Sequence, residues 1–172
     1  HIRGKSKPIT ANDEIPISRV AGSFIIDVNN QRELIGSADY VFVGEVISKD
    51  GYEYRDPVTM DVDEETVTLT SPYTIYTVQV LENIKGNLRT DTSIPIAKDG
   101  GLSEDGSCYV LYENDEFPVE KEFYIFYAFA QQDGSLLLAG PNSNIKIEYP
   151  NDNAEYPNDS AEYPNDSAEY SE

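Results

Sequence analysis

Residues 37–46 read SADYVFVGEV, residues 73–86 read YTIYTVQVLENIKG, and residues 123–129 read FYIFYAF. Val, Ile, Tyr and Phe dominate all three stretches, and these are the residue types that strands favour. In the second stretch, polar and apolar side chains alternate with the period of two that a half-buried strand requires. Acidic, turn-rich connections separate the three stretches. The chain is therefore expected to be mainly β and to close into a barrel.

Weaker signals add a short helix and further strands. Asn30 can cap a helix over residues 30–39 through its side-chain oxygen, and Glu33 stands where a capping box places its acid. Gly44 lies inside a predicted strand, where glycine often marks a bulge. The remaining strands are expected at residues 23–28, 92–97, 108–112, 135–139 and 144–147.

A long acidic insertion, residues 49–71, is expected between the first two barrel strands. Most of it reads as a solvated loop, and a strand at residues 67–69 would turn it into a hairpin arm. Its acidic run includes Asp61, Asp63 and Glu64, which suggests either a calcium loop or the paired carboxylates of a hydrolase. The run lacks the glycine and the final glutamate of an EF-hand loop, and paired catalytic acids require burial. These features favour the solvated loop.

Composition divides the chain into three parts: a flexible arm at residues 1–22, a barrel domain at 23–147 and a tail at 148–172. The arm carries the basic residues Arg3, Lys5 and Lys7. The tail repeats Glu-Tyr-Pro-Asn-Asp-(Asn/Ser)-Ala every seven residues, and a proline in each repeat forbids a continuous helix. It reads either as a spacer or as a multivalent ligand that presents Tyr149, Tyr156, Tyr163 and Tyr170.

The charge balance restricts the partners of this chain. With 32 acidic and 12 basic residues, its formal net charge is −20, which disfavours nucleic acid and anionic membranes as partners. The one cysteine, Cys108, rules out an internal disulfide and is expected as a small buried side chain in a strand. The one histidine is His1. We find no catalytic constellation, and we predict neither a cofactor nor a metal.

The chain is expected to work outside the cell. It starts at His1 rather than Met, which suggests a processed bacterial protein that has lost its leader. No apolar run approaches the roughly 20 residues of a membrane span. We therefore expect a secreted or cell-surface protein. Its oligomeric state is not predicted.

Two phrases carry a resemblance to a known family. Residues 34–46, with the pattern Leu-x-x-x-Ala-Asp followed by Val-x-Val-Gly-x-Val, resemble the opening of bacterial OB-fold proteins related to the netrin/TIMP-like superfamily. So do residues 76–86, which end in Val-Leu-x-x-x-Lys-Gly. The resemblance covers roughly residues 33–147. It implies a five-stranded OB-like Greek-key barrel, with one short N-terminal helix, that binds another protein.

The inhibitors of that superfamily grip a protease's zinc with an N-terminal cysteine held by disulfides. This chain begins with His1 and has Cys108 alone, so no inhibitory residue carries over. Oligonucleotide binding, the other common use of the fold, needs a basic groove beside stacking aromatics. The sequence supplies the aromatic side chains without the basic groove.

We predict a protein-binding module without enzymatic activity, either a plain binder or an inhibitor, with the acidic tail as a spacer. Its partner would be another extracellular protein or a cell-surface component. The alternative is a structural cell-surface or matrix component whose repeat tail mediates attachment or multivalent binding. Tyrosine gives large contact areas at low entropic cost, so the binding face is expected to use tyrosines. The candidates are Tyr40, Tyr73, Tyr76, Tyr112 and Tyr127.

Overall fold

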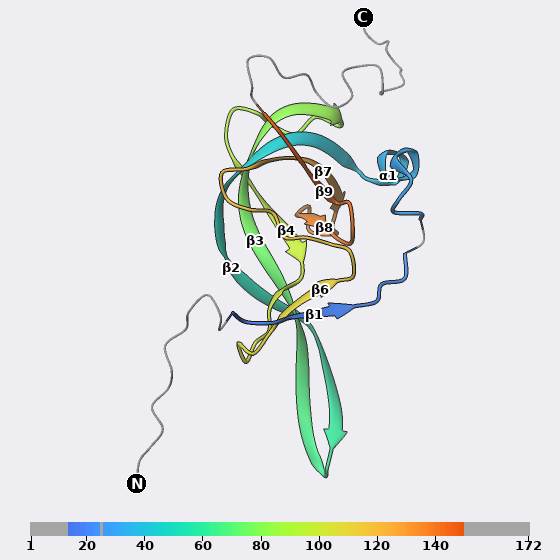
Figure 1. Cartoon of the computed structure of the whole chain (residues 1–172), viewed down its shortest axis with the longest axis vertical. Helices are drawn as coiled ribbons and strands as arrows, with labels where there is room; N and C mark the ends of the chain where they lie inside the picture. The colour runs from blue at the N-terminus through green and yellow to red at the C-terminus, as the bar shows by residue number, and fades with distance from the viewer. Residues whose placement is uncertain (1–13, 25, 150–172) are drawn as a thin grey trace, which may run out of the picture.

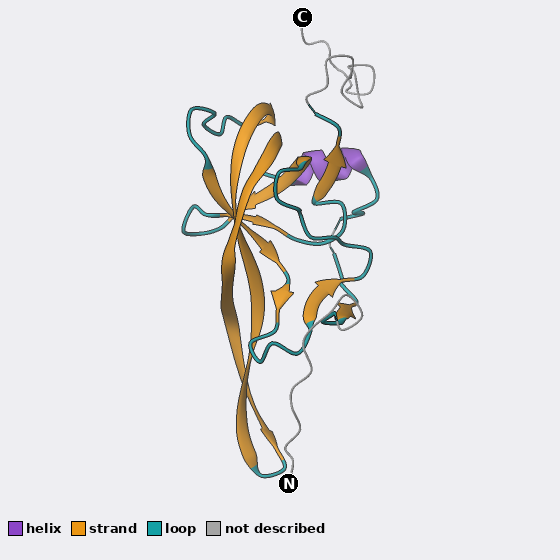
Figure 2. Cartoon of the chain, turned by 60° about the vertical axis from the view of Figure 1, so that its left-hand side comes forward, coloured by secondary structure: helices purple, strands orange, loops and turns teal. Residues whose placement is uncertain are grey.

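The computed structural model describes residues 14–24 and 26–149. Within them the fold is mainly β, with one helix and nine strands in two sheets (Figures 1 and 2). The count differs from the five strands expected, because the large sheet has a sixth strand and a small second sheet is added. The strands are β1 (Ile17–Val20), β2 (Tyr40–Val62), β3 (Glu65–Lys85), β4 (Ile94–Asp99), β5 (Gly101–Leu102), β6 (Tyr109–Tyr112), β7 (Phe123–Ala130), β8 (Leu136–Leu138) and β9 (Asn144–Ile147).

The larger sheet closes on itself. Its strands follow the order β2-β3-β4-β8-β7-β9, and β2 also pairs with β7, so that β2, β3, β4, β8 and β7 form a ring. The β4–β8 pairing is parallel and the other pairings of the ring are antiparallel. The strands predicted at 123–130 and 144–147 are confirmed, as β7 and β9.

Two apolar clusters lie on opposite faces of β2. Phe42 and Val46 point into one cluster with Tyr76 of β3. Val41 and Val43 point into the other, which includes residues of the helix. A shift of register between Val43 and Gly44 confirms the expected bulge at this glycine. A Cβ on Gly44 would lie 2.9 Å from a methyl group of Val78, so the close approach of β3 also requires glycine here.

The helix, α1 (Gln31–Ser37), begins as predicted. The side chain of Asn30 accepts hydrogen bonds from the amides of Arg32 and Glu33. The carboxylate of Glu33 accepts from the amide of Asp27 rather than from that of Asn30, so the capping box is only partly formed. The short helix is held against β2 and β7 by its buried residue Leu34 and by Ala38.

The second sheet has the order β1-β6-β5, with β1 parallel to β6. Part of the segment expected to be a flexible arm, Ile17–Val20, is therefore a strand. All four of its residues are exposed, so β1 has no apolar pattern that would reveal it in the sequence. The strand predicted at 23–28 is wrong, because Asp27 instead forms a turn before α1 and accepts a hydrogen bond from the amide of Asn29.

The insertion at 49–71 is a hairpin arm, whereas we expected mostly loop. Strands β2 and β3 stay paired from the barrel out to Val62 and Glu65. Figure 1 shows this ribbon projecting away from the barrel. Asp63 and Glu64 form the two-residue turn at its tip, with φ values of 52° and 68°. The loop prediction rested on the acidic composition of this segment. Apolar and polar side chains nevertheless alternate with a period of two in both strands of the arm, as in a regular sheet.

A buried ion pair fixes the connection between β6 and β7. Lys98 of β4 donates to Asp115 of this connection over 2.7 Å, and both side chains are buried. Arg19 of β1 donates to the backbone oxygen of Asp115, so the small sheet is tied to the same point. Residues 113–122 therefore have a fixed position relative to both sheets. In the described part of the chain, no helix is long and apolar enough to cross a membrane.

Candidate functional site

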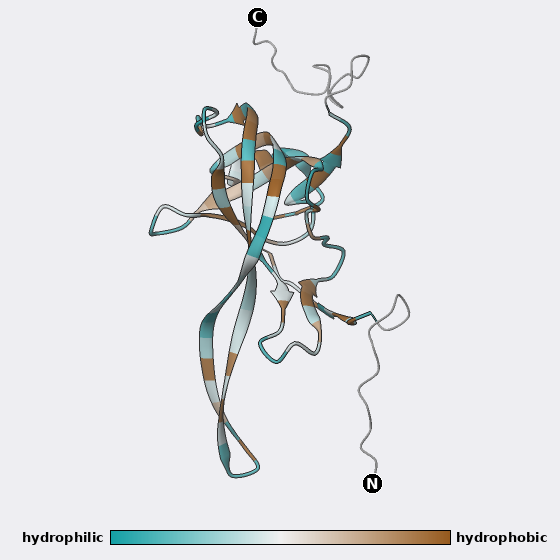
Figure 3. Ribbon diagram, turned by 90° about the vertical axis from the view of Figure 1, so that its left-hand side faces the viewer, coloured by the Kyte–Doolittle hydropathy of each residue, from teal (hydrophilic) through white to brown (hydrophobic). Residues whose placement is uncertain are grey.

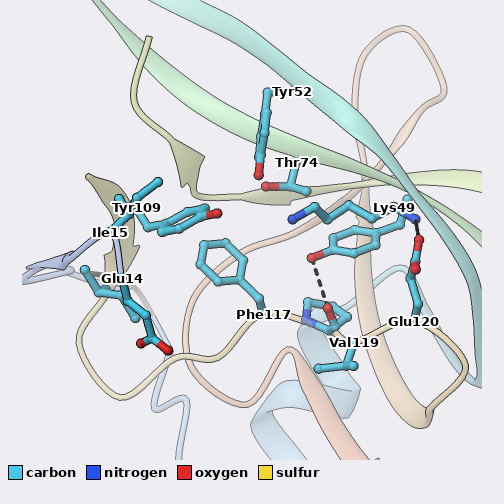
Figure 4. Close-up of a pocket in the computed structure, with 12 residues that line it drawn as sticks. Glu14, Ile15, Lys49, Tyr52, Thr74, Tyr109, Phe117, Val119 and Glu120 are labelled. Carbon is cyan, nitrogen blue, oxygen red and sulfur yellow. Dashed lines mark hydrogen bonds between the residues drawn. The ribbon is translucent and has the colours of Figure 1, made fainter. Parts of the chain in front are cut away.

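A groove of about 700 Å³ lies where the base of the arm meets the small sheet and the β6–β7 connection. Its walls come from segments far apart in the sequence, around residues 14–17, 49–52, 74–76, 109 and 117–120. Figure 4 shows these side chains facing a common space. The groove is larger than the second pocket, of about 200 Å³, which lies beside Asp99 and Tyr112.

Aromatic rings form much of the groove lining. They belong to Tyr52 of β2, Tyr76 of β3, Tyr109 of β6 and Phe117. The rings of Tyr109 and Phe117 meet edge to face with centroids 5.9 Å apart. The Tyr76 hydroxyl donates to the backbone oxygen of Pro118 over 3.1 Å, and burial raises the pKa of this phenol. These contacts hold the rings in place before any ligand arrives.

Glycine allows the floor of the groove to close tightly. The hydroxyl of Thr74 donates to the backbone oxygen of Gly100 over 2.7 Å. A Cβ on Gly101 would lie 2.7 Å from that hydroxyl and 2.9 Å from the ring of Tyr52. The small sheet can therefore approach the base of the arm only because residue 101 has no side chain.

Lys49 places a positive charge in the groove. Its ammonium lies 5.4 Å from the ring centroid of Tyr52, and its amide donates to the Glu120 carboxylate over 2.7 Å. Figure 4 shows the ammonium reaching toward Thr74 and Tyr109. Burial raises the pKa of Tyr109, and the nearby charge of Lys49 opposes that rise. Among the described residues, no ion pair involves the Lys49 ammonium.

The arrangement suits binding better than bond-breaking chemistry. Flat phenyl and phenol faces offer apolar contact, the tyrosine hydroxyls can donate or accept, and one ammonium can donate to a ligand oxygen. The acids considered for a hydrolase, Asp61, Asp63 and Glu64, are exposed at the far end of the arm. Within residues 14–24 and 26–149, no three His, Cys, Asp or Glu side chains gather closely enough to hold a metal ion.

Two of the predicted tyrosines are buried rather than displayed. Tyr76 is 1% exposed; it belongs to the barrel core and is also part of the groove lining. Tyr127 is also 1% exposed and packs beneath α1, where Gln31 donates to its hydroxyl over 3.4 Å. The alternation predicted around Tyr76 in β3 was correct, but the predicted face of exposed tyrosines does not include these two.

The other predicted tyrosines do not form one face. Tyr40 packs against the barrel core. Tyr73 lies at the base of the arm, where its hydroxyl donates to Asp56. Tyr112 donates to Asp99 and meets the ring of Phe24. Tyr149 packs on Phe123, with ring centroids 5.5 Å apart. Tyr156, Tyr163 and Tyr170 lie outside the described residues.

The predicted site omitted most of the groove residues. Tyr52 lies in the segment expected to be loop, and Phe117 lies in the β6–β7 connection. Cys108, expected inside a strand, is half-buried directly before β6, next to the groove residue Tyr109. A strand period in residues 49–54 is the one local signal that would have placed Lys49 and Tyr52 on an ordered element.

Comparison with known proteins gives no relative. No protein-family model matches the chain, and no curated protein or solved structure is significantly similar to it. The case for function therefore rests on the groove and the arm.

Proposed function

We propose that this chain is a secreted or cell-surface binding module without enzymatic activity, and that its groove holds an extended segment of a partner protein. The observation that carries the proposal is the groove itself, whose lining contains four aromatic rings and the ammonium of Lys49, which has no ion-pair partner among the described residues. Small ligand sites are typically concave and apolar, with few polar groups that fix orientation. This groove has that composition, and its lining residues come from several elements.

We also propose that the ring of strands is an OB-like Greek-key barrel of the netrin/TIMP-like type. Three features support this proposal. The ring joins β2-β3-β4-β8-β7, the pairing β4–β8 is parallel, and α1 stands directly before the first barrel strand. The sequence phrases at 34–46 and 76–86 fall on α1, β2 and β3. Binding of another protein is the activity that this resemblance implies.

An extended peptide is the ligand class that best suits the lining. Extended and proline-rich segments bind in aromatic-lined grooves because their backbones lose little entropy on binding. Tyr52, Tyr109 and Phe117 offer ring faces for apolar or proline side chains. Lys49 can donate to a backbone carbonyl or a carboxylate of the segment.

The second candidate is a structural component of the cell surface, anchored through the repeat tail. Its support is the contact of Tyr149, the first tyrosine of the repeats, with Phe123 of the barrel. Replacing the tail tyrosines by serine in the producing cells tests this role. Loss of surface retention supports attachment through the tail, and unchanged retention counts against it.

Peptide selection tests the groove directly. The full chain is used to select binders from a random peptide library displayed on phage, and the selected peptides are then titrated against Tyr109→Ala. We expect peptides rich in proline or apolar residues that bind the wild-type chain and are lost on the variant. A pool that binds both proteins equally would overturn the groove as the site.

The charge of Lys49 provides a second variant that leaves the core intact. Lys49→Gln should lower the affinity of the chain for the selected peptide by about tenfold, as expected for a lost hydrogen bond from a charged donor. The matched control is Arg32→Gln, which removes an exposed cation from α1 away from the groove. Equal affinity of both variants would exclude a direct role for Lys49.

A further inference from the structure

The arm has one apolar face. In the register of β2 and β3, Val58 pairs with Leu69 and Met60 pairs with Val67, while Val62 pairs with Glu65 at the tip. Directly paired residues of antiparallel strands point to the same side, so these side chains share a face. Val58 is 55% exposed and Leu69 is 50% exposed. Figure 3 shows apolar positions on both strands of the arm, outside the barrel. We call Val58, Met60, Val62, Val67 and Leu69 the apolar face.

The opposite face of the arm is polar and makes its own contacts. Thr59 and Thr68 pair across the strands with their hydroxyls 3.5 Å apart. The Thr66 hydroxyl donates to Asp61 over 3.0 Å. The arm is thus an amphipathic two-stranded sheet whose apolar side is uncovered in the described part of the chain. An isolated two-stranded ribbon is marginally stable in water, so covering this side would stabilise it.

The charged side chains of the arm beyond Arg55 are all negative. From residue 56 to residue 84 the chain has no Lys or Arg, while Asp61, Asp63, Glu64 and Glu65 lie around the tip. The nearest base, Arg55, is engaged by Glu53 over 2.8 Å and lies 4.5 Å from the Tyr73 ring centroid. Among the described residues, no ion pair neutralises the acidic side chains of the tip.

We propose that the arm is a second docking surface, separate from the groove, for a protein whose apolar contact area is bordered by Lys and Arg. The apolar face would cover that central area, and the acids of the tip would pair with the basic border. Charge complementarity selects this partner over a second copy of the chain. Two copies, each with a net charge of −20, would bring acidic tips and acidic bodies together.

Synthetic peptides provide defined probes for this chemistry. A peptide of alternating Val and Lys is titrated into the full chain and compared with a Val and Glu peptide of equal length. We expect the Lys peptide to bind, its affinity to fall as salt is raised, and the Glu peptide not to bind. Equal binding of both peptides would overturn the charge argument.

Substitutions on the two faces of the arm localise the contact. The triple variant Val58→Ser, Met60→Ser and Leu69→Ser should lower the affinity for the Lys peptide by about tenfold, because a few buried apolar side chains contribute most of the affinity of an interface. The matched control is Thr59→Ser with Thr68→Ser on the polar face, for which affinity should be unchanged. Unchanged affinity in both variants would place the contact elsewhere.

Three further measurements keep the proposal testable if the triple variant folds poorly. Amide hydrogen exchange of the wild-type chain with bound Lys peptide should show protection within residues 58–69; protection elsewhere alone would overturn the proposal.

Sedimentation of the free chain should give a monomer. A dimer whose amides at residues 58–69 are protected from exchange would make a second copy the occupant. Stronger peptide binding after Arg3→Gln, Lys5→Gln and Lys7→Gln would make residues 1–13 the occupant. Either result contradicts the proposal.

Discussion

The Nζ atom of Lys98 lies 2.7 Å from Oδ1 of Asp115, and the two side chains are 0% and 1% exposed. Lys98 also donates to Ser143 and Asn144, each over 2.8 Å. The ion pair therefore joins β4, the β6–β7 connection and the start of β9. Because Phe117 to Glu120 follow Asp115 directly, this pair also positions one wall of the groove.

Removing one partner of this ion pair should be strongly destabilising. Asp115→Ala leaves the Lys98 ammonium buried without its counter-charge, which costs about 3–5 kcal/mol in comparable pairs. The double variant Lys98→Met with Asp115→Leu should recover much of that loss. Urea denaturation checks both free energies of unfolding. A double variant no more stable than Asp115→Ala would contradict this account of the pair.

The stability of the fold should depend on pH through Asp99. Burial raises the pKa of Asp99 above its usual value of 3.8, partly opposed by the hydrogen bond from Tyr112. The folded state therefore binds this proton more tightly than the unfolded state does. The contribution of the bound proton to the free energy of unfolding is complete below pH 3.8 and is lost as pH rises through the raised pKa. Asp99→Asn removes this dependence. Relative to wild type, the variant should gain stability as pH rises from 3.8 through the raised pKa of Asp99, as measured by denaturation at each pH; a constant difference would contradict the assignment.

The tip of the arm carries strain that glycine would relieve. Glu64 has a φ of 68°, where a residue with a Cβ is disfavoured by roughly 1 kcal/mol. Glu64→Gly should therefore raise the free energy of unfolding by up to about 1 kcal/mol. The control is Glu65→Gly, which lies in β3 and should destabilise instead. Opposite signs for these neighbouring substitutions support the turn geometry, and equal signs would contradict it.

The cap of α1 gives a further prediction. Asn30→Ala removes the acceptor for the amides of Arg32 and Glu33, and caps of this kind contribute about 0.5–2 kcal/mol. Asn30→Asp should retain most of that stability because its carboxylate accepts the same hydrogen bonds. Thermal unfolding followed by circular dichroism distinguishes the two. Equal losses of stability in the two variants would show that Asn30 does not stabilise the helix through the hydrogen bonds that its side chain accepts.

The sequence predicted those elements whose local pattern agrees with their burial. Strand β7 is a continuous apolar run buried on both faces, and Asn30 is a capping residue at the start of a short apolar helix. A hairpin arm was predicted only through a strand at residues 67–69, which lies in β3. The outgoing strand of the arm, which ends at Val62 in β2, was missed because its acidic residues indicate solvent and its apolar side chains are exposed. Strand β1 was missed because it is held by backbone pairing to β6 and buries no side chain.

The groove was beyond prediction for a different reason. A period of two assigns Tyr76 and Tyr73 to opposite faces of β3, but it cannot tell which face becomes the interior. Tyr76 proved to be core. The groove also needs β1, the base of the arm, β6 and the β6–β7 connection in one place. That juxtaposition depends on the β1–β6 pairing and on the Lys98–Asp115 ion pair, neither of which leaves a local signal.

The most direct test of the groove compares two tyrosines of the same strand. Tyr109 and Tyr112 both lie in β6, and each makes an edge contact with a phenylalanine ring. Only Tyr109 lines the groove. For a peptide selected on the wild-type chain, Tyr109→Ala should weaken binding by about thirtyfold, the size expected for a central aromatic contact, while Tyr112→Ala should leave it unchanged. Equal affinities for the two variants, both verified as folded, would contradict the groove as the binding site.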